Sequence, residues 1–376
     1  MPVVCEMSHV CERGTPTLAG LAKPIDHIST EEDYEMKRAG LALIGMLLAG
    51  SAACAQSDVP ILSGALAFLG ANNGGSPTYQ PIIAPVLVAP LGDHFVVESR
   101  ADVQGFIFRE NGNTGPYNGI FAASLDYLQL DYIANPHLTV TVGRFLTPFN
   151  MYNERLSAVW ITNLQQAPII FTIGTRTSAS SNGAMVRGVA IDHPNWTLTY
   201  TAYVSALTTT ENLQAGRAAG GRAGLFLPHQ GFEVGASYQR FLQSGDFNVS
   251  GMYLVWEPPQ IPLDVRAEYA HSPGGQGYWL EGAYRLASSR DTTTWLSRVQ
   301  AIARVQQYFK GNPTPEDLLP SADVNQFDVG LNYYLTHNIR LNGSYGRQYS
   351  SAGNANIWSF QITYRFLFPA WPGGHQ

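Results

Sequence analysis

Arginines and carboxylates alternate with apolar residues along many segments of this 376-residue chain. In residues 263–270, the charged residues Asp264, Arg266 and Glu268 are separated by apolar ones. Successive side chains of a β-strand point to opposite faces, so such charges gather on one face. There they can neutralise their neighbours across strands, or act together on a passing ion or polar solute. Strand phase places eight residues of each sign on this face: Arg100, Arg222, Arg266, Arg285, Arg298, Arg304, Arg340 and Arg365, with Glu98, Asp102, Asp126, Glu233, Asp264, Glu268, Glu281 and Asp328.

The composition indicates where this charged face lies. Only 13% of the residues are charged, whereas soluble domains carry about 25%. After position 56 there are 17 arginines and a single lysine, Lys310. Lysine is common on solvated surfaces, whereas arginine suits planar pairing with carboxylates. No apolar run reaches the ~18 residues of a membrane helix. We therefore predict an all-β transmembrane antiparallel barrel with a polar lumen, and pore-lining roles for the inward charges. A secreted β-sandwich that binds ligands is the soluble alternative.

The turns predict about 16 strands. Short links at 91–93, 134–136, 193–195, 228–230, 257–261, 288–293 and 336–338 alternate with links at 70–80, 111–118, 149–181, 209–216, 242–246, 273–276, 310–323 and 350–355. An even strand number requires a weak strand at 217–227 and an opening strand near 60–69. A break in the alternation within 125–133 predicts a β-bulge.

Aromatic residues mark the expected lipid face. In the last segment, Trp358, Phe360, Ile362, Tyr364, Phe366 and Phe368 alternate with polar residues. With Tyr253, Trp256, Tyr333 and Tyr345, the aromatic members of this segment are expected on the outer wall or in the interface girdles.

The longest link, 149–181, is the candidate constriction. It carries Glu154, Arg155 and Trp160, together with several amide side chains suited to polar solutes. The link either folds inward to narrow the lumen or caps the mouth from outside, and the sequence leaves both arrangements open.

The segment VGRFLTPFNMYNERL (142–156) resembles the GxFxxPF region of the phosphate-selective porin O/P-like group. The matching positions are Gly143, Arg144, Phe145, Pro148 and Phe149. The resemblance implies a trimeric diffusion channel of about 16 strands with inward loops. Members of that group are similar in having a lysine-rich lumen, and the single lysine here departs from that pattern. The balanced charges instead predict weak ion selectivity.

The N-terminal region predicts export. Lys37 and Arg38 precede an apolar stretch at 39–50 and the small residues Ala53 and Ala55. These three regions predict a signal peptide at 36–55, cleaved before residue 56. A buried helix and a lipoprotein anchored at Cys54 are the alternatives. Residues 1–35 are expected to be an over-extended gene start or disordered, and residues 56–376 to form the barrel.

No nucleophile elbow, zinc-protease motif, P-loop or dinucleotide-binding motif is present in the sequence. We therefore expect no catalytic residues, no cofactor and no metal. The predicted function is passive diffusion of small hydrophilic solutes or ions across the outer membrane of a Gram-negative bacterium. The expected partners are outer-membrane lipid, polar solutes or anions and two further copies in a homotrimer, but not nucleic acid. An outer-membrane enzyme or an adhesin of the same fold remains an alternative.

Overall fold

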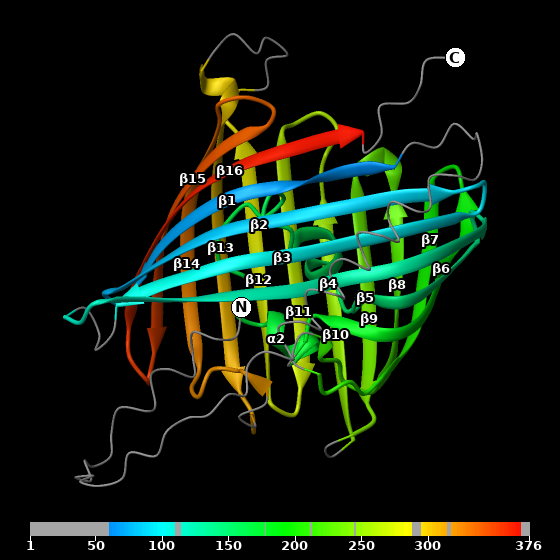
Figure 1. Ribbon diagram of the computed structural model, residues 1–376, viewed down its shortest axis with the longest axis horizontal. Helices are drawn as coiled ribbons and strands as arrows, with labels where there is room; N and C mark the ends of the chain where they lie inside the picture. Colours follow the sequence, from blue (N-terminus) through cyan, green and yellow to red (C-terminus); the bar gives the residue numbers. More distant parts are fainter. Residues whose placement is uncertain are drawn as a thin grey trace, which may run out of the picture. The chain divides into compact units, whose positions relative to one another are not determined.

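The computed structural model describes residues 60–109, 114–176, 178–210, 213–243, 246–287, 295–313 and 317–369. These residues form sixteen strands in one closed barrel, in which each strand is antiparallel to its neighbours in the chain and β1 pairs with β16 (Figure 1). The predicted fold class and even strand number are therefore confirmed. The predictions for 1–35, the signal peptide at 36–55, Cys54 and the whole 288–293 link lie outside the described residues.

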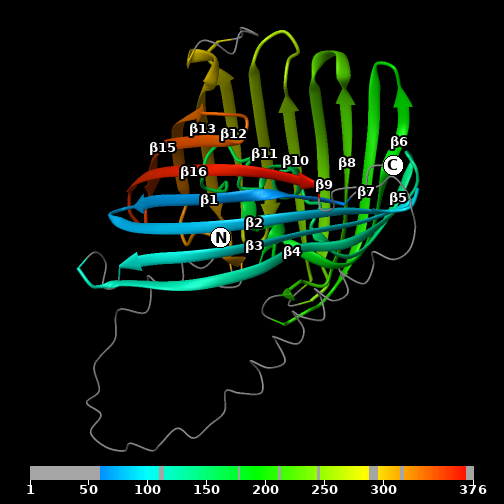
Figure 2. The ribbon, with the colours of Figure 1, turned by 45° about the horizontal axis from the view of Figure 1, so that its top comes forward.

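The strands differ in length. Their bounds are β1 Ile61–Asn73, β2 Ser76–Leu91, β3 Phe95–Arg109, β4 Tyr117–Asn135, β5 Leu138–Leu146, β6 Ser180–His193, β7 Trp196–Ala206, β8 Ala218–Leu227, β9 Phe232–Phe241, β10 Phe247–Trp256, β11 Leu263–Ser272, β12 Gly275–Arg285, β13 Val299–Lys310, β14 Val324–Tyr334, β15 Ile339–Ser350 and β16 Ala355–Pro369. The front wall of β1–β4 crosses the rear wall at a steep angle (Figure 2), as expected for strands tilted against a barrel axis.

Short helical turns lie outside the strands. They are η3 (Tyr152–Leu156) and α2 (Phe171–Thr175) between β5 and β6, η5 (Pro228–Gln230) before β9, and η6 (Trp295–Arg298) before β13. The predicted weak strand at 217–227 is β8. The predicted link at 70–80 is wrong, because Gly74 and Gly75 turn the chain within two residues at φ 58° and 96° and let β1 and β2 continue on either side.

The two faces of the wall follow the predicted alternation. In β16, Trp358 and Phe360 are more than half exposed on the outside, whereas Ser359 and Gln361 are buried on the inside. Tyr253 is the exception to the predicted outer aromatics. It is 2% exposed and its hydroxyl donates to Glu233 Oε1 across 2.8 Å inside the barrel, because it occupies the inward phase of β10.

The predicted bulge lies at Asp126. Arg100 pairs with Tyr127 and Ala101 with Leu125, so Asp126 is the extra residue in β4. The described pairing of β4 with β5 begins only at Leu128. The preceding part of β4 is therefore paired with β3 on one side only, and its other side is a free edge of the wall formed by β1–β4.

Candidate functional site

The long loop between β5 and β6 folds into the barrel and packs against the inner side of its wall. β5 ends after nine residues, because Thr147 and Pro148 follow and a proline cannot donate to a strand ladder. Thr147 N donates to Ala179 O across 3.0 Å, which ties the two ends of the loop together. Residues 147–179 lie between these ends, and we call them the inward loop. Of the two arrangements left open by the sequence, the structure has the inward one.

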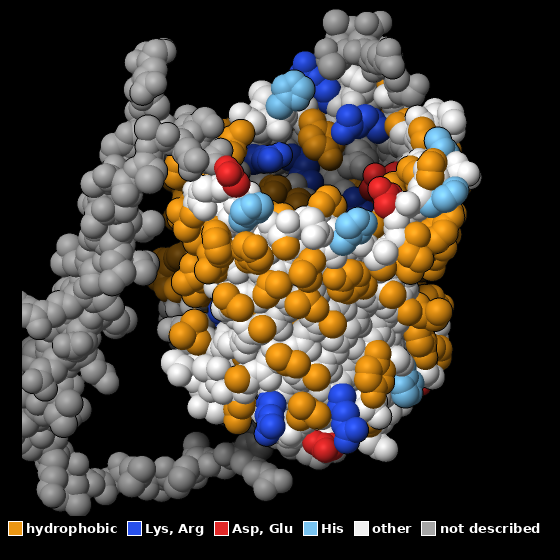
Figure 3. Space-filling model, turned by 90° about the vertical axis from the view of Figure 1, so that its right-hand side faces the viewer, with side chains coloured by type: hydrophobic (Ala, Val, Ile, Leu, Met, Phe, Trp, Pro, Cys, Tyr) orange, Lys and Arg blue, Asp and Glu red, His pale blue; other side chains and the backbone are white. Residues whose placement is uncertain are grey.

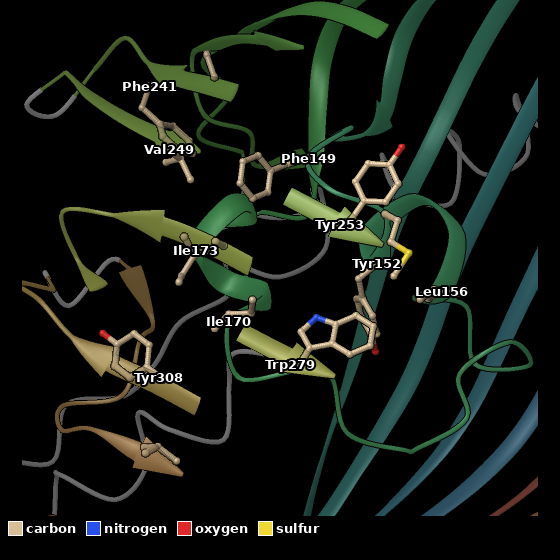
Figure 4. Close-up of a cluster of buried hydrophobic side chains, with 14 residues drawn as sticks. Phe149, Tyr152, Leu156, Ile170, Ile173, Phe241, Val249, Tyr253, Trp279 and Tyr308 are labelled. Atoms are coloured by element: carbon tan, nitrogen blue, oxygen red, sulfur yellow. The ribbon is translucent and has the colours of Figure 1, made fainter. Parts of the chain in front are cut away.

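An apolar cluster fixes the inward loop to the rear wall (Figure 4). Its loop members are Phe149, Met151, Tyr152, Leu156, Ile170 and Ile173, and its wall members are Ala218, Phe241, Val249, Tyr253, Ala270, Trp279, Tyr308 and Val324. Burial in this cluster raises the pKa of the Tyr152 hydroxyl well above its usual value. The barrel thus has its hydrophobic core inside the lumen, between loop and wall.

Glu268 anchors the start of η3. Its Oε1 accepts hydrogen bonds from the backbone N–H groups of Met151 and Tyr152, at 2.8 and 2.7 Å, and its Oε2 accepts one from Trp279 Nε1 at 3.0 Å. The first N–H groups of a helix have no partner within it, and a carboxylate is a strong acceptor for them. This wall carboxylate therefore binds the loop backbone.

Two charged pairs join η3 to β8 and β9. Arg222 contacts Glu154 at 2.6 Å and donates to Asn150 O at 2.5 Å. Arg155 donates through both terminal nitrogens to Glu233, at 2.7 and 2.9 Å. Burial lowers the pKa of Arg155, but the hydrogen bonds and charge of Glu233 outweigh it and raise the pKa overall.

The later part of the inward loop is held by β12–β16. Asn163 donates to Glu281 Oε1 at 2.9 Å, and Arg304 donates to Gln166 O at 2.9 Å and pairs with Asp328 at 3.3 Å. Arg340 donates to the carbonyls of Val159 and Thr162. Arg304 is only 2% exposed, so this group braces the loop from the wall.

The loop also contacts the front wall. Arg100 donates to Ser157 Oγ at 3.2 Å and pairs with Asp126 at 2.7 Å. Trp160 and its neighbour Val159 pack against the buried Ala67, Ile82 and Ala84 of β1 and β2. The inward loop is therefore supported on both sides of the lumen.

Other predicted pore-lining residues do not contact the loop through any described bond. Asp264 and Arg266 pair with each other at 2.5 Å, and Glu98 accepts from Gln129 at 3.3 Å. Asp102 is half-buried two residues beyond Arg100 on β3, and Arg285 and Arg365 are exposed on the inward phase of β12 and β16. Arg298 lies in η6 rather than in a strand and donates to Leu335 O. Figure 3 shows the hydrophobic outer wall below a hollow lined by charged side chains.

Sequence reasoning missed an inward pair between β4 and β6. Asp131 is 3% exposed and lies 3.5 Å from Arg187, with Gln129 donating to it at 2.9 Å. The bulge at Asp126 shifts the phase of β4, so counting by twos from Asp126 puts Asp131 on the wrong face. Restarting the alternation of inward and outward residues after the predicted bulge would have placed Asp131 on the inward face.

The motif residues lie where β5 ends and the inward loop begins. Gly143 has φ 117°, and a Cβ there would lie 2.5 Å from Leu128 O, so only glycine fits this approach of β5 to β4. Arg144 donates to Leu125 O and to Asn182 Oδ1, at 2.5 and 2.9 Å. Phe145 packs edge-on against Tyr203. Pro148 ends the strand, and Phe149 begins the apolar cluster.

Among the residues that the structure describes, no helix is long and apolar enough to cross a membrane. The same residues contain no group of three or more histidine, cysteine or acidic side chains that could hold a metal ion.

No known family model matches this sequence, and no curated protein matches it. Solved structures do match its fold. OprB of Pseudomonas putida aligns with a TM-score of 0.57 at 11% identity, over 82% of this chain and 94% of that one. The anion-selective porin of Comamonas acidovorans aligns with a TM-score of 0.54 at 11% identity, over 82% and 100%. OmpT of Vibrio cholerae, an outer-membrane protein in trimer form, gives 0.52 at 11% identity, over 83% and 100%. The chain thus has the sixteen-stranded fold of outer-membrane porins.

Proposed function

We propose that this protein is a passive diffusion channel for small hydrophilic solutes in the outer membrane of a Gram-negative bacterium, with no chemical step. The observation that carries the proposal is the inward loop, which reaches across the lumen and is bonded to wall strands on both sides. A loop held in this way would narrow the path through the lumen. Its fixed polar groups would set the size and polarity of what passes.

The pairing of arginines with carboxylates in the lumen supports a channel with weak ion selectivity. Arg155, Arg222 and Arg266 each lie within 2.7 Å of a carboxylate. Each pair leaves little net field for ions of either sign. A phosphate-selective pore, as the motif resemblance implies, calls for a surplus of positive charge at the constriction. The resemblance to the phosphate-selective group therefore stays a prediction of the family, and it does not identify the solute.

We also infer a homotrimer, which the trimer form of the similar OmpT fold supports. Light scattering of the detergent-extracted protein tests this assembly, and a monomeric mass would contradict it.

Planar-bilayer recording tests the channel directly. The folded protein should produce stepwise increases in current with uniform conductance, whereas the same sample denatured by boiling should produce none. Folded protein that inserts without conductance steps would contradict the proposal and favour the enzyme or adhesin alternatives.

A further inference from the structure

The outer wall carries tyrosine–amide pairs at the barrel end with the longer links. In each pair, an outward tyrosine hydroxyl donates to an amide side-chain oxygen on the next strand, across 2.8–3.1 Å. The pairs are Tyr238 with Asn248, Tyr269 with Gln276, Tyr278 with Gln307 and Tyr345 with Asn356, and we call them the tyrosine–amide belt. At the other end of the barrel, the outward Tyr200 donates instead to the backbone carbonyl of His137. The two rims of the outer wall therefore differ in their polar groups.

The amides of the belt still have hydrogen bonds to give. Each pair occupies the amide oxygen, whereas an asparagine or glutamine nitrogen can donate two hydrogen bonds. Within the described residues, no protein group accepts from these four nitrogens. Because the pairs are spread over the strands from β9 to β16, they fit a lipid layer around the barrel better than one soluble ligand.

Arg347 lies in the belt, on the outward face of β15. It is in register with Asn356 of β16 and donates to Asn356 Oδ1 at 2.6 Å. Its guanidinium lies 5.3 Å from the centre of the Tyr349 ring. Among the described residues, no carboxylate forms an ion pair with Arg347. A positive charge on the outer wall thus has no counter-charge from the protein.

The position of Arg347 indicates which counter-charge it meets. β15 ends at Ser350, three residues beyond Arg347. In the membrane setting proposed above, the longer links lie on the external side, so Arg347 is level with the headgroups of the outer leaflet. A guanidinium can bind a phosphate group through two parallel N–H···O bonds. A phosphate of a lipid headgroup therefore suits this side chain in both charge and shape.

The surface beside Arg347 suits a sugar ring. Tyr349 and Trp358 are 51% and 59% exposed, and the rings of Tyr345 and Trp358 lie 4.5 Å apart between centroids. Exposed aromatic faces can cover the C–H faces of a sugar, while the Asn356 nitrogen can donate to its hydroxyls. Guanidinium, amide and aromatic groups at one place match a headgroup that is both phosphorylated and hydroxylated.

We propose that this rim binds an outer-leaflet lipid with a phosphorylated saccharide headgroup. Arg347 binds the phosphate, and Asn356, Tyr349 and Trp358 contact the sugar. The proposal rests on the membrane setting of the proposed function, but it does not depend on whether the barrel conducts.

Native mass spectrometry of the detergent-extracted, folded protein tests the site. The probe is lipid A, a diglucosamine lipid with two phosphate groups, added over a range of concentrations. Arg347→Gln removes the charge but keeps a donor. It should raise the half-saturating concentration about 10-fold or more, because hydrogen bonds to charged groups are stronger than neutral ones.

Arg240→Gln is the matched control. Arg240 lies at the same rim, at the end of β9, but it pairs with Asp246 at 3.3 Å. This variant should leave the binding of lipid A unchanged. An equal weakening by both arginine variants would overturn the assignment of Arg347.

The lipids provide a second test that needs no variant. Wild-type protein should bind lipid A about 10-fold more tightly than the same lipid without its phosphates, and equal binding would overturn the phosphate site. Phosphatidylglycerol that binds as tightly as lipid A would overturn the saccharide assignment. Absence of conductance steps in planar bilayers would refute the channel alone, so the two proposals fail separately.

Discussion

Glu268 illustrates how a single wall residue can shape the pore from a distance. Its carboxylate accepts two backbone N–H groups of η3 and the indole N–H of Trp279, all within 3.0 Å. An acidic residue in phase with the lumen would ordinarily be assigned to the permeation path. Here the carboxylate binds the inward loop, so we expect Glu268 to affect the current by fixing the position of that loop.

Glu268→Gln should loosen the inward loop while the barrel still folds. The amide nitrogen cannot accept a hydrogen bond, so at least one donor loses its partner, and a bond to a charged group contributes ~1.5–3 kcal/mol. We expect larger current fluctuations and altered conductance in single-channel records. Glu98→Gln is the control, because Glu98 accepts only from Gln129 in the described structure. Identical noise in both variants would contradict the anchoring role.

Ile362 tests the outer face at a single position. It lies in the middle of β16 and is 39% exposed on the outside. Ile362→Arg should cost ~2–4 kcal/mol of folding free energy at the bilayer midplane, whereas arginine near the interface costs ~0–1. Leu91→Arg provides the comparison, because Leu91 is the last residue of β2 and its side chain is exposed on the outside. Urea unfolding in lipid vesicles measures the folding free energy of both variants. An equal loss of folding free energy in the two would contradict the depth assigned to Ile362.

The inward loop fits against the wall because glycines face it. A Cβ at Gly251 of β10 would lie 2.3 Å from Asn150 Oδ1, and at Gly330 of β14 it would lie 2.8 Å from Leu164 Cδ2. These positions let loop side chains approach the wall backbone. The loop is therefore matched to the barrel in shape as well as in polar contacts.

Gly251→Val should displace η3 and change single-channel conductance without unfolding the barrel. The atoms nearest the new Cβ all belong to the Asn150 side chain, so the strand itself can accept the residue. Gly282→Val is the control, since a Cβ there meets no atom within 4 Å. A wild-type conductance for Gly251→Val would mean that the loop does not form the narrow part of the path.

The strands were predictable because alternation and turns are local signals. The period of two assigned the faces of β16, and the turn spacing required a strand where β8 lies. The path of the inward loop was not predictable, because it depends on contacts between residues such as Asn163 and Glu281 that are 118 positions apart. Tyr253 was misplaced although its signal is local, because it lies three residues before Trp256 and therefore on the opposite face of β10. An inward aromatic needs an apolar partner inside the lumen, and only the folded loop supplies one.

Charge is distributed through the barrel as close pairs. Most of the inward arginines discussed above contact a carboxylate, and Arg340 binds backbone carbonyls instead. Arg155 is the most accessible loop member of these pairs, with its side chain 41% exposed. Removing one partner from such a pair is the clearest way to unbalance the lumen.

Arg155→Gln should shift the channel toward cations. Glu233 then keeps its charge without its main partner, and the excess negative charge acts in a narrow space. The reversal potential in a salt gradient should move in the cation direction at 0.1 M salt. The shift should fade toward 1 M, as the Debye length falls from ~10 to ~3 Å. Arg240→Gln is the control, because its pair with Asp246 is more than half exposed at the strand end. No shift, or an equal shift in both variants, would place Arg155 away from the ion path.

The free edge along the first part of β4 limits where lipid can lie in the membrane setting proposed for this chain. Hydrocarbon offers no partner to a backbone N–H or C=O group, so an unpaired strand edge is excluded from it. At Ile120–Ser124 the edge of β4 has no described neighbour, whereas the carbonyls of Leu125 and Asp126 accept from Arg144 and Ser180. The hydrocarbon boundary on this side therefore falls no further out than Asp126. We therefore expect Phe121, which is 86% exposed beyond that line, to lie in the headgroup layer or against a neighbouring protein.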